Sequence, residues 1–329
     1  MMRSNARIGF TAAALAGAAL AVCLAGCGPE SGLTGTSDRT FTVSGPVRLE
    51  IVNGSGDSRV SAGPSGEVRI HAQFRVFAWP WEDAQHKLEA VEANPPFSQS
   101  NNLIRIGNPG WDWNDFAADY TVTAPADAEV RAVAGSGNID VNGVHGPASF
   151  VAGSGNVSAS AISDDVRTTV DSGRVRLADV QGHVQVIAGS GDINIDGAKG
   201  EVRVRSGSGN IQVERPGGTV VGDTGSGNVS VTGATGDLRL HSASGDITVD
   251  GNPSATSYWD FRASSGEVRL KVPSDASLRF YAHSGSGDID VGIPGAIEEQ
   301  GERHEVHARI GDGKARVEAQ TSSGSISLH

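Results

Sequence analysis

The feature that most constrains the fold is a Ser-Gly pair that recurs at a constant interval (154 − 136 = 18). The regular pairs begin at Ser136, Ser154, Ser172, Ser190, Ser208, Ser226 and Ser244. The interval then lengthens slightly before Ser265 and Ser286, and it roughly doubles before the pair returns at Ser323. A repeat this short cannot bury an apolar face alone, so its copies must stack on one another.

Residues on both sides of each pair alternate between apolar and polar. In one repeat, Val202 and Val204 precede the corner, and Ile211 and Val213 follow it on either side of the polar Gln212. Period two is that of a β-strand with one buried face. Each unit therefore predicts a strand, a Ser-Gly corner, a second strand and a Gly-rich corner.

These units predict an all-β protein, a single-chain parallel β-solenoid with coils of about 18 residues and two short strands each. The composition agrees, because 45 glycines and only 2 methionines suit thin, tightly turning coils. Equivalent positions form columns, including a mostly Asn/Asp column beside the corner in which stacked amides can bond one another. At the corner itself we expect glycine because it accepts a positive φ. The column comprises Asn138, Asn156, Arg174, Asp192, Asn210, Asn228, Asp246, Glu267 and Asp288.

We expect residues 130–329 to form the regular solenoid and residues 40–129 to form irregular first coils with a helical insertion. Pro80 suits the first turn of a helix, and Trp81, Ala84, Leu88 and Val91 follow at helical spacing. Terminal repeats of solenoids need atypical pieces of this kind as caps.

Four of the five tryptophans fall in this irregular region. Two interpretations are open for Trp79, Trp81, Trp111 and Trp113: a platform for sugar rings or peptide, or packing that fixes a cap on the first coil.

Residues 1–26 resemble a lipoprotein signal peptide. Arg3 and Arg7 precede an apolar run, and Leu24-Ala25-Gly26-Cys27 resembles the lipobox in which the cysteine becomes the acylated first residue. An uncleaved membrane anchor and an ordinary secretory cleavage are the alternatives. The prediction is a lipid anchor on Cys27, a tether over residues 27–39 and a place in the cell envelope. Gly28 favours the outer membrane if the host has two membranes.

Charge argues against some partners. Without Arg3 and Arg7 the chain keeps 26 − 2 = 24 basic residues against 38 acidic ones, a net charge of −14. Such a surface repels nucleic acid and anionic lipid headgroups. We therefore expect no nucleic-acid partner, and a membrane contact only through the lipid.

Motifs with known chemistry fit poorly. His304 and His307 lack the spacing of a zinc-protease helix, and the Gly-Asp stretches occur once per coil, where calcium-binding rolls need two. No long loop between residues 130 and 250 could build a catalytic cleft. We predict no catalytic, cofactor or metal residues.

One family resemblance rests on specific residues. The stretch Tyr120-Thr-Val-Thr-Ala-Pro125, the following residues 129–141, Gly311-Asp312-Gly313 and Ser323-Gly324-Ser325-Ile326 resemble the bacterial putative-adhesin β-strand-repeat family, a domain of unknown function. The resemblance covers roughly residues 40–329 and implies the solenoid fold, with no catalytic residues to carry over.

The function expected from these patterns is a non-catalytic envelope lipoprotein that presents a polar surface for binding or adhesion. The alternatives are a scaffold that assembles end to end and a polysaccharide-active enzyme. The pattern of residues 325–329 predicts a final strand, which either pairs with a second molecule or is covered by residues 294–305. The oligomeric state stays open.

Overall fold

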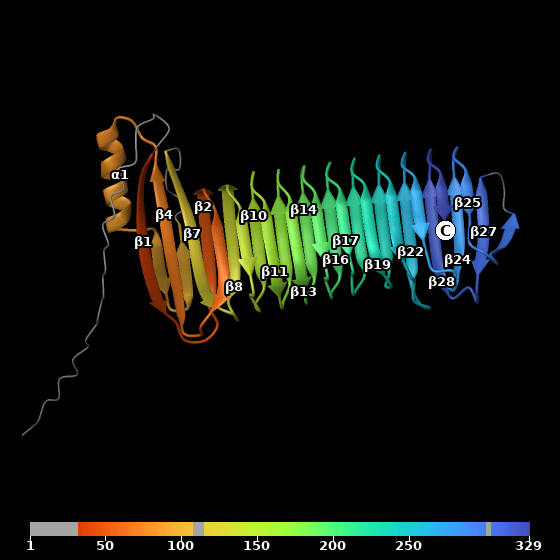
Figure 1. Cartoon of the computed structure of the whole chain (residues 1–329), viewed down its shortest axis with the longest axis horizontal. Coiled ribbons are helices and arrows are strands. Elements are labelled where there is room, and N and C mark those ends of the chain that lie inside the picture. The colour runs from red at the N-terminus through yellow and green to blue at the C-terminus, as the bar shows by residue number, and fades with distance from the viewer. Residues whose placement is uncertain (1–31, 108–114, 301–303) are drawn as a thin grey trace, which may run out of the picture.

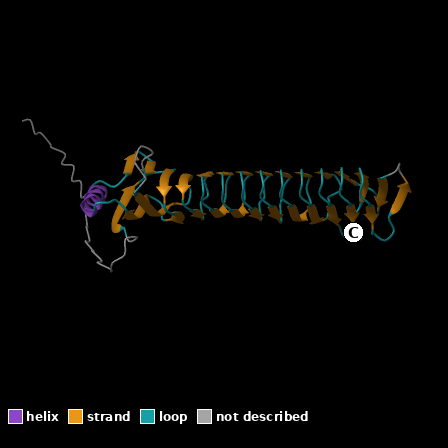
Figure 2. Cartoon of the chain, turned by 90° about the horizontal axis from the view of Figure 1, so that it is seen from above, coloured by secondary structure: helices purple, strands orange, loops and turns teal. Residues whose placement is uncertain are grey.

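The computed structural model describes residues 32–107, 115–300 and 304–329. The chain forms a long stack of coils in which two sheets lie face to face, with the one described helix at the N-terminal end (Figures 1 and 2). The described strands make one 14-stranded and one 15-stranded sheet, both mostly parallel. The predicted β-solenoid is confirmed. The predicted signal peptide, residues 1–26, and Cys27 lie outside the described residues.

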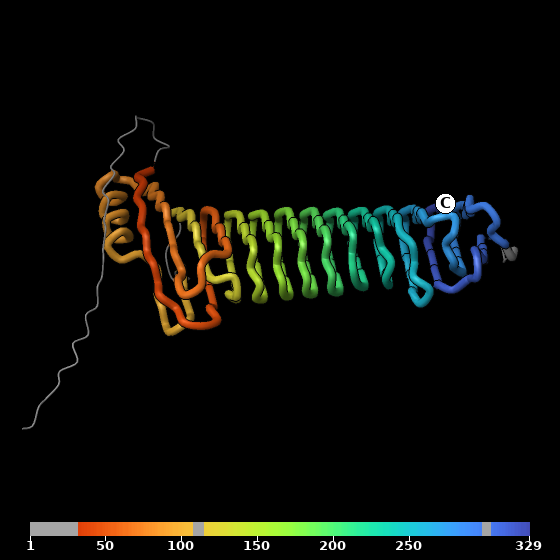
Figure 3. Tube along the Cα trace, turned by 60° about the horizontal axis from the view of Figure 1, so that its bottom comes forward, coloured from red at the N-terminus to blue at the C-terminus, as the bar shows by residue number. Residues whose placement is uncertain are grey.

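The middle of the stack is regular, and each coil contributes one strand to each sheet (Figure 3). The 15-stranded sheet receives β8 (Glu129–Ser136), β10 (Ala148–Ala152), β12 (Val166–Val170), β14 (Val184–Ala188), β16 (Val202–Ser206), β18 (Val220–Thr224), β20 (Leu238–Ser242) and β22 (Tyr258–Ala263). The 14-stranded sheet receives β9 (Ile139–Asn142), β11 (Val157–Ile162), β13 (Val175–Val180), β15 (Ile193–Asp196), β17 (Ile211–Glu214), β19 (Val229–Ala234), β21 (Ile247–Gly251) and β23 (Val268–Lys271).

The core is the narrow space between the two sheets. Alternate residues of every regular strand point into it, so Val202 and Ile211 are buried while Arg203 and Gln212 face solvent. Parallel pairing sets Val202 beside Val220, one coil further on. Full burial of a Val or Ile side chain stabilises the fold by roughly 1.5–3 kcal/mol, and the column repeats this in every coil.

Close approach between coils explains the glycine of the Ser-Gly corner. A Cβ atom on Gly209 would lie 1.8 Å from the carbonyl oxygen of Gly191 in the preceding coil. The expectation that this glycine adopts a positive φ is wrong. Positive φ values instead form a column at the opposite corner, occupied by Gly143, Ala161, Asp179, Gly197, Arg215 and Gly233.

The Asn/Asp column is a hydrogen-bond ladder. At eight positions, a side-chain oxygen accepts a bond from the backbone N–H at the same place in the next coil, as Asn138 Oδ1 does from Asn156 at 3.0 Å. Amide-to-amide bonds accompany some rungs, so the predicted stacking of amides is only part of the ladder. The acceptors are Asp119, Asp57, Asn138, Asn156, Asp192, Asn210, Asn228 and Asp246.

The N-terminal end departs from the regular coil. Its elements are β1 (Leu33–Thr42), β2 (Arg48–Ser55), β3 (Ser58–Gly63), β4 (Glu67–Val76), α1 (Trp81–Ala93), β5 (Phe97–Ser100), β6 (Leu103–Ile106) and β7 (Phe116–Pro125). The predicted helix is confirmed, with Ala84, Leu88 and Val91 buried. The predicted tether is wrong from Leu33 onward, because β1 pairs antiparallel with β4 along its whole length.

Chain order and spatial order differ at this end. The coil made by β2 and β3 lies between the coil of β6 and β7 and the coil of β8 and β9. The first complete coil is therefore held on both sides by later parts of the chain.

The C-terminal end shows the same inversion. Its strands are β24 (Leu278–Ser284), β25 (Ile289–Val291), β26 (Ile297–Gln300), β27 (Glu305–Ile310), β28 (Ala315–Thr321) and β29 (Ile326–Leu328). The last coil, β28 and β29, inserts between the coil of β22 and β23 and that of β24 and β25. The solenoid is thus regular only to β23, and not to residue 329 as expected.

The final strand is not a free edge. β29 has β23 on one side and β25 on the other, so of the two expected outcomes the strand is covered and does not pair with a second molecule. The covering strand is β25, whereas residues 294–305 supply strands to the other sheet, where β26 and β27 run antiparallel. Glu302 and Arg303 lie outside the described residues. Within the described chain, no helix has the length and apolar character to cross a membrane.

Candidate binding surface

The outer face of the 15-stranded sheet carries charges in rows. On alternate coils, an acid-apolar-arginine triplet marks the start of the strand: Glu129-Val-Arg131, Asp165-Val-Arg167, Glu201-Val-Arg203 and Asp237-Leu-Arg239. The strands between them place uncharged Ser149, Gln185 and Val221 in the arginine row.

Between β8 and β20, this alternation keeps the arginines of the row apart, whereas Arg316, Arg279 and Arg309 are neighbours near the C-terminal end. Neighbouring strands lie roughly 4.8 Å apart, so arginines on alternate coils are separated by about twice that distance. Acidic and basic side chains pair on this face, as Arg48 does with Glu129 and Arg203 with Glu201, although the whole chain is acidic. The net charge of the chain therefore does not describe this surface.

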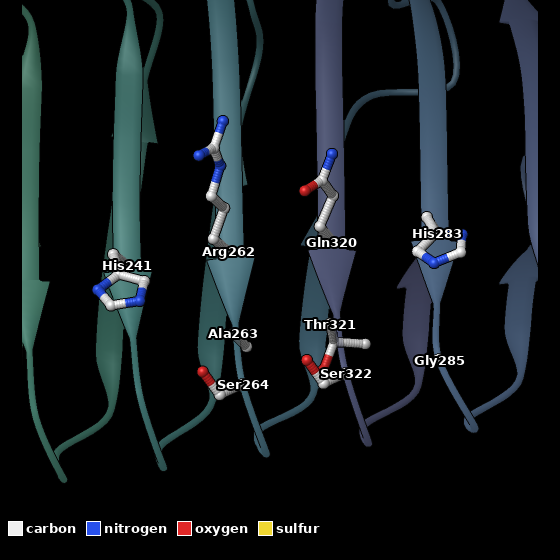
Figure 4. Close-up of a pocket in the computed structure, with 9 residues that line it drawn as sticks. All are labelled: His241, Arg262, Ala263, Ser264, His283, Gly285, Gln320, Thr321 and Ser322. Atoms are coloured by element: carbon white, nitrogen blue, oxygen red, sulfur yellow. The ribbon is translucent and has the colours of Figure 1, made fainter.

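A shallow hollow of about 390 Å³ opens on the same face near the C-terminal end (Figure 4). Four side chains cross it in register on adjacent strands: His241 of β20, Arg262 of β22, Gln320 of β28 and His283 of β24. Ser264 and Ser322 line its lower rim at the Ser-Gly corners.

Two side chains of this row are held and two are free to bind. Asp223 contacts His241 at 3.2 Å and Asp260 contacts Arg262 at 3.2 Å. Among the described residues, neither Gln320 nor His283 has a side-chain hydrogen bond. The row thus offers the amide of Gln320 and the imidazole of His283 to a ligand, beside the paired His241 and Arg262, and all four side chains are exposed.

An aromatic and cationic cluster lies on neighbouring strands. The Arg316 guanidinium carbon lies 5.6 Å from the ring centroids of both Tyr258 and Tyr281. The Tyr258 hydroxyl donates a 2.7 Å hydrogen bond to Glu318, and this bond, with burial, raises the pKa of Tyr258 to about 12.

The hollow does not carry the chemistry of a glycosidase. Its lining residues include no carboxylate, whereas glycoside hydrolysis commonly needs a facing pair. His304 and His307 do not converge on a metal site either: His307 contacts Glu305 at 2.8 Å, and no group of three ligating side chains occurs in the described chain.

Of the four tryptophans in the irregular region, the structure describes two. Trp79 is 87% exposed, whereas Trp81 is 47% exposed and so buries about half of its surface. Trp111 and Trp113 lie outside the described residues. The interpretation as a ligand platform stays a prediction.

Sequence periodicity did not reveal the hollow, because the strands that line it are not consecutive in the chain. Gln320 and Arg262 are distant in the sequence, and only the insertion of the last coil places them side by side. At the N-terminal end, the sequence does contain a signal for an additional coil. Ser55-Gly56-Asp57 repeats the Ser-Gly-Asn/Asp corner sequence, and Asp57 belongs to the hydrogen-bond ladder. Its distance from Ser136 is not a whole number of repeats.

The fold and its polar faces define a β-solenoid repeat protein with no recognisable catalytic centre among the described residues. The chain belongs to the Toastrack DUF4097 family, whose model matches residues 115–222 and 219–329. No protein with a curated description matches the sequence.

Two solved structures are similar over most of their length. One is described as a putative cell adhesion protein from Clostridium sporogenes, with 12% identity, a TM-score of 0.25, and coverage of 89% of this chain and 99% of that one. The other is described as a putative adhesin from Bacteroides fragilis, with 12% identity, a TM-score of 0.33, and coverage of 90% and 97%. At these scores neither structure supports an argument about binding.

Proposed function

We propose that the chain is a non-catalytic cell-envelope lipoprotein whose solenoid presents the outer face of the 15-stranded sheet for binding or adhesion. The observation that carries this proposal is the in-register row His241, Arg262, Gln320 and His283 across the hollow. These side chains are donors and acceptors suited to hydroxyl-rich or anionic groups.

The anchoring part of the proposal rests on the lipobox-like sequence ending at Cys27. Two or more acyl chains give stable membrane attachment, where one gives marginal attachment. Mass spectrometry of protein extracted from the envelope should find an acylated N-terminal peptide that starts at Cys27. Cys27→Ser should release the chain or leave the leader uncleaved, and an unmodified N-terminus elsewhere would refute the anchor.

The binding part can be tested with matched variants. A pull-down from intact envelopes with the lipidated protein should recover a partner, and His283→Ala with Gln320→Ala should reduce that recovery. The control pair is Gln212→Ala with Thr248→Ala, which removes exposed polar side chains from the opposite sheet. Equal losses from both pairs would remove the hollow from the proposal.

End-to-end assembly is the second candidate, and one observation favours it. Among the described strands, β25 has a neighbour on one side only, so its outer backbone groups can pair with another molecule. However, β25 is a short strand, and Asp290 at its centre places a charge on that edge. Light scattering over a wide concentration range decides the matter: a persistent monomer would eliminate assembly.

A further inference from the structure

Three large aromatic side chains within five residues of one another are exposed at the N-terminal end of the stack. Phe77 is 51%, Trp79 87% and Trp81 47% exposed. They follow the end of β4, where Phe74 and Val76 are still fully buried. An exposed apolar cluster of this kind marks an interaction site more often than chance placement does.

The position of this aromatic cluster relates it to the start of the chain. Leu33 pairs with Val76 at the end of β1, and Gly32 lies against the ring of Phe77: a Cβ atom on Gly32 would be 2.8 Å from Phe77 Cδ1. Five peptide steps separate Gly32 from Cys27, a reach of at most about 18 Å. A lipid on Cys27 would therefore hold the aromatic cluster next to a bilayer.

The chemistry of the cluster fits the membrane interface. Tryptophan combines a large apolar ring with one N–H donor, and it concentrates where hydrocarbon meets headgroups. Glu82 and Asp83, in the first turn of α1, are exposed beside the cluster. Two carboxylates at this place disfavour anionic headgroups, so the surface that fits is a neutral, zwitterionic one.

We propose that Phe77, Trp79 and Trp81 form a second membrane contact, which inserts into the interface of a zwitterionic bilayer beside the lipid anchor. The solenoid would then be held at its N-terminal end, with the hollow of the 15-stranded sheet far from the membrane (Figure 1). This proposal takes its setting from the proposed anchor, while its chemistry stands on the exposed aromatic cluster.

Tryptophan quenching tests this contact directly. The lipidated chain, in a Trp111→Phe/Trp113→Phe background, is reconstituted in phosphatidylcholine vesicles with brominated or ordinary acyl chains. Brominated chains should quench the emission, and Trp79→Ser with Trp81→Ser should remove the quenched component. Trp259 is fully buried and supplies an unquenched internal reference. Equal emission in both kinds of vesicle would overturn the proposal, as would emission that responds to soluble glycans and not to lipid.

A Cys27→Ser chain that also lacks residues 1–26 separates this contact from the anchor. It should bind phosphatidylcholine vesicles weakly and independently of salt, and loss of both tryptophans should weaken that binding roughly tenfold or more. Wild-type protein that carries no acyl group at Cys27, but whose tryptophans are still quenched by the vesicles, would refute the anchor and leave the aromatic contact standing. Acylation at Cys27 without quenching of the tryptophans would support the anchor and refute the aromatic contact.

Discussion

The Oδ1 atom of Asn210 accepts a hydrogen bond from the backbone N–H of Asn228, one coil further along the solenoid, at 3.0 Å. The same bond joins coil to coil along most of the stack. It gives an exposed corner N–H a partner where the strands have ended, and each rung stabilises the fold by about 1 kcal/mol.

Arg174 interrupts this ladder. Its guanidinium has no acceptor to offer, and the backbone N–H of Asp192 has no side-chain partner within the described chain. We expect Arg174→Asn to supply that acceptor and raise the free energy of unfolding by about 1 kcal/mol. Urea titration measures the change. Arg176→Asn, on the following strand and outside the ladder, is the control and should give no gain.

Asp246 makes the stability of its coil depend on pH. The backbone N–H of Glu267 and the Arg269 guanidinium hold the pKa of Asp246 below its usual range. A depressed pKa stabilises the folded chain above the ordinary value of about 3.9, and this contribution is lost as pH falls through the folded pKa. Asp246→Asn keeps the acceptor but not the charge. Wild type and variant should differ in unfolding free energy by less than about 1 kcal/mol at pH 7, because the pair is exposed. This difference should shrink on acidification. A difference that grows as the pH falls would contradict this cause.

Gly209→Ala tests the close approach of successive corners. The new Cβ atom would meet the carbonyl oxygen of Gly191, so the coils must separate locally. We expect a loss of about 3 kcal/mol in unfolding free energy. Ser208→Ala, at the exposed neighbouring position, should change it by no more than about 0.5 kcal/mol. Equal effects would show that the corner glycine has another role.

Ile211→Asp and Gln212→Asp test which face of a strand is buried. Ile211 is 1% exposed, so aspartate there places an unpaired charge between the sheets and should unfold the neighbouring coils. Gln212 faces solvent, and aspartate there should cost less than about 1 kcal/mol. The two midpoints of denaturant unfolding give the comparison, and similar midpoints would mean that the in-out register is wrong.

The regular coils could be predicted from the sequence because the information is local. The constant interval between Ser-Gly pairs, the alternation around Ile211 and the helical spacing of Ala84, Leu88 and Val91 all appear within short windows. Each of these elements is present in the structure.

The order of the coils at the two ends could not be predicted from the sequence. The apolar pattern of a strand indicates how it aligns with a parallel neighbour, but it does not indicate which strand that neighbour is. The strand ending at Leu328 has the same apolar pattern whether it lies last in the stack or between Leu270 and Val291. The hollow depends on that insertion, since it sets Gln320 between Arg262 and His283. Its side chains therefore looked unrelated in the sequence.

Photo-crosslinking in intact cells tests the central claim, that the outer face of the 15-stranded sheet is the binding surface. A photoreactive phenylalanine analogue replaces His283 at the hollow or, as a control, Thr248 on the opposite sheet. We predict discrete adducts from position 283 and none from position 248. The same adducts from both positions, or none from either, would contradict the claim.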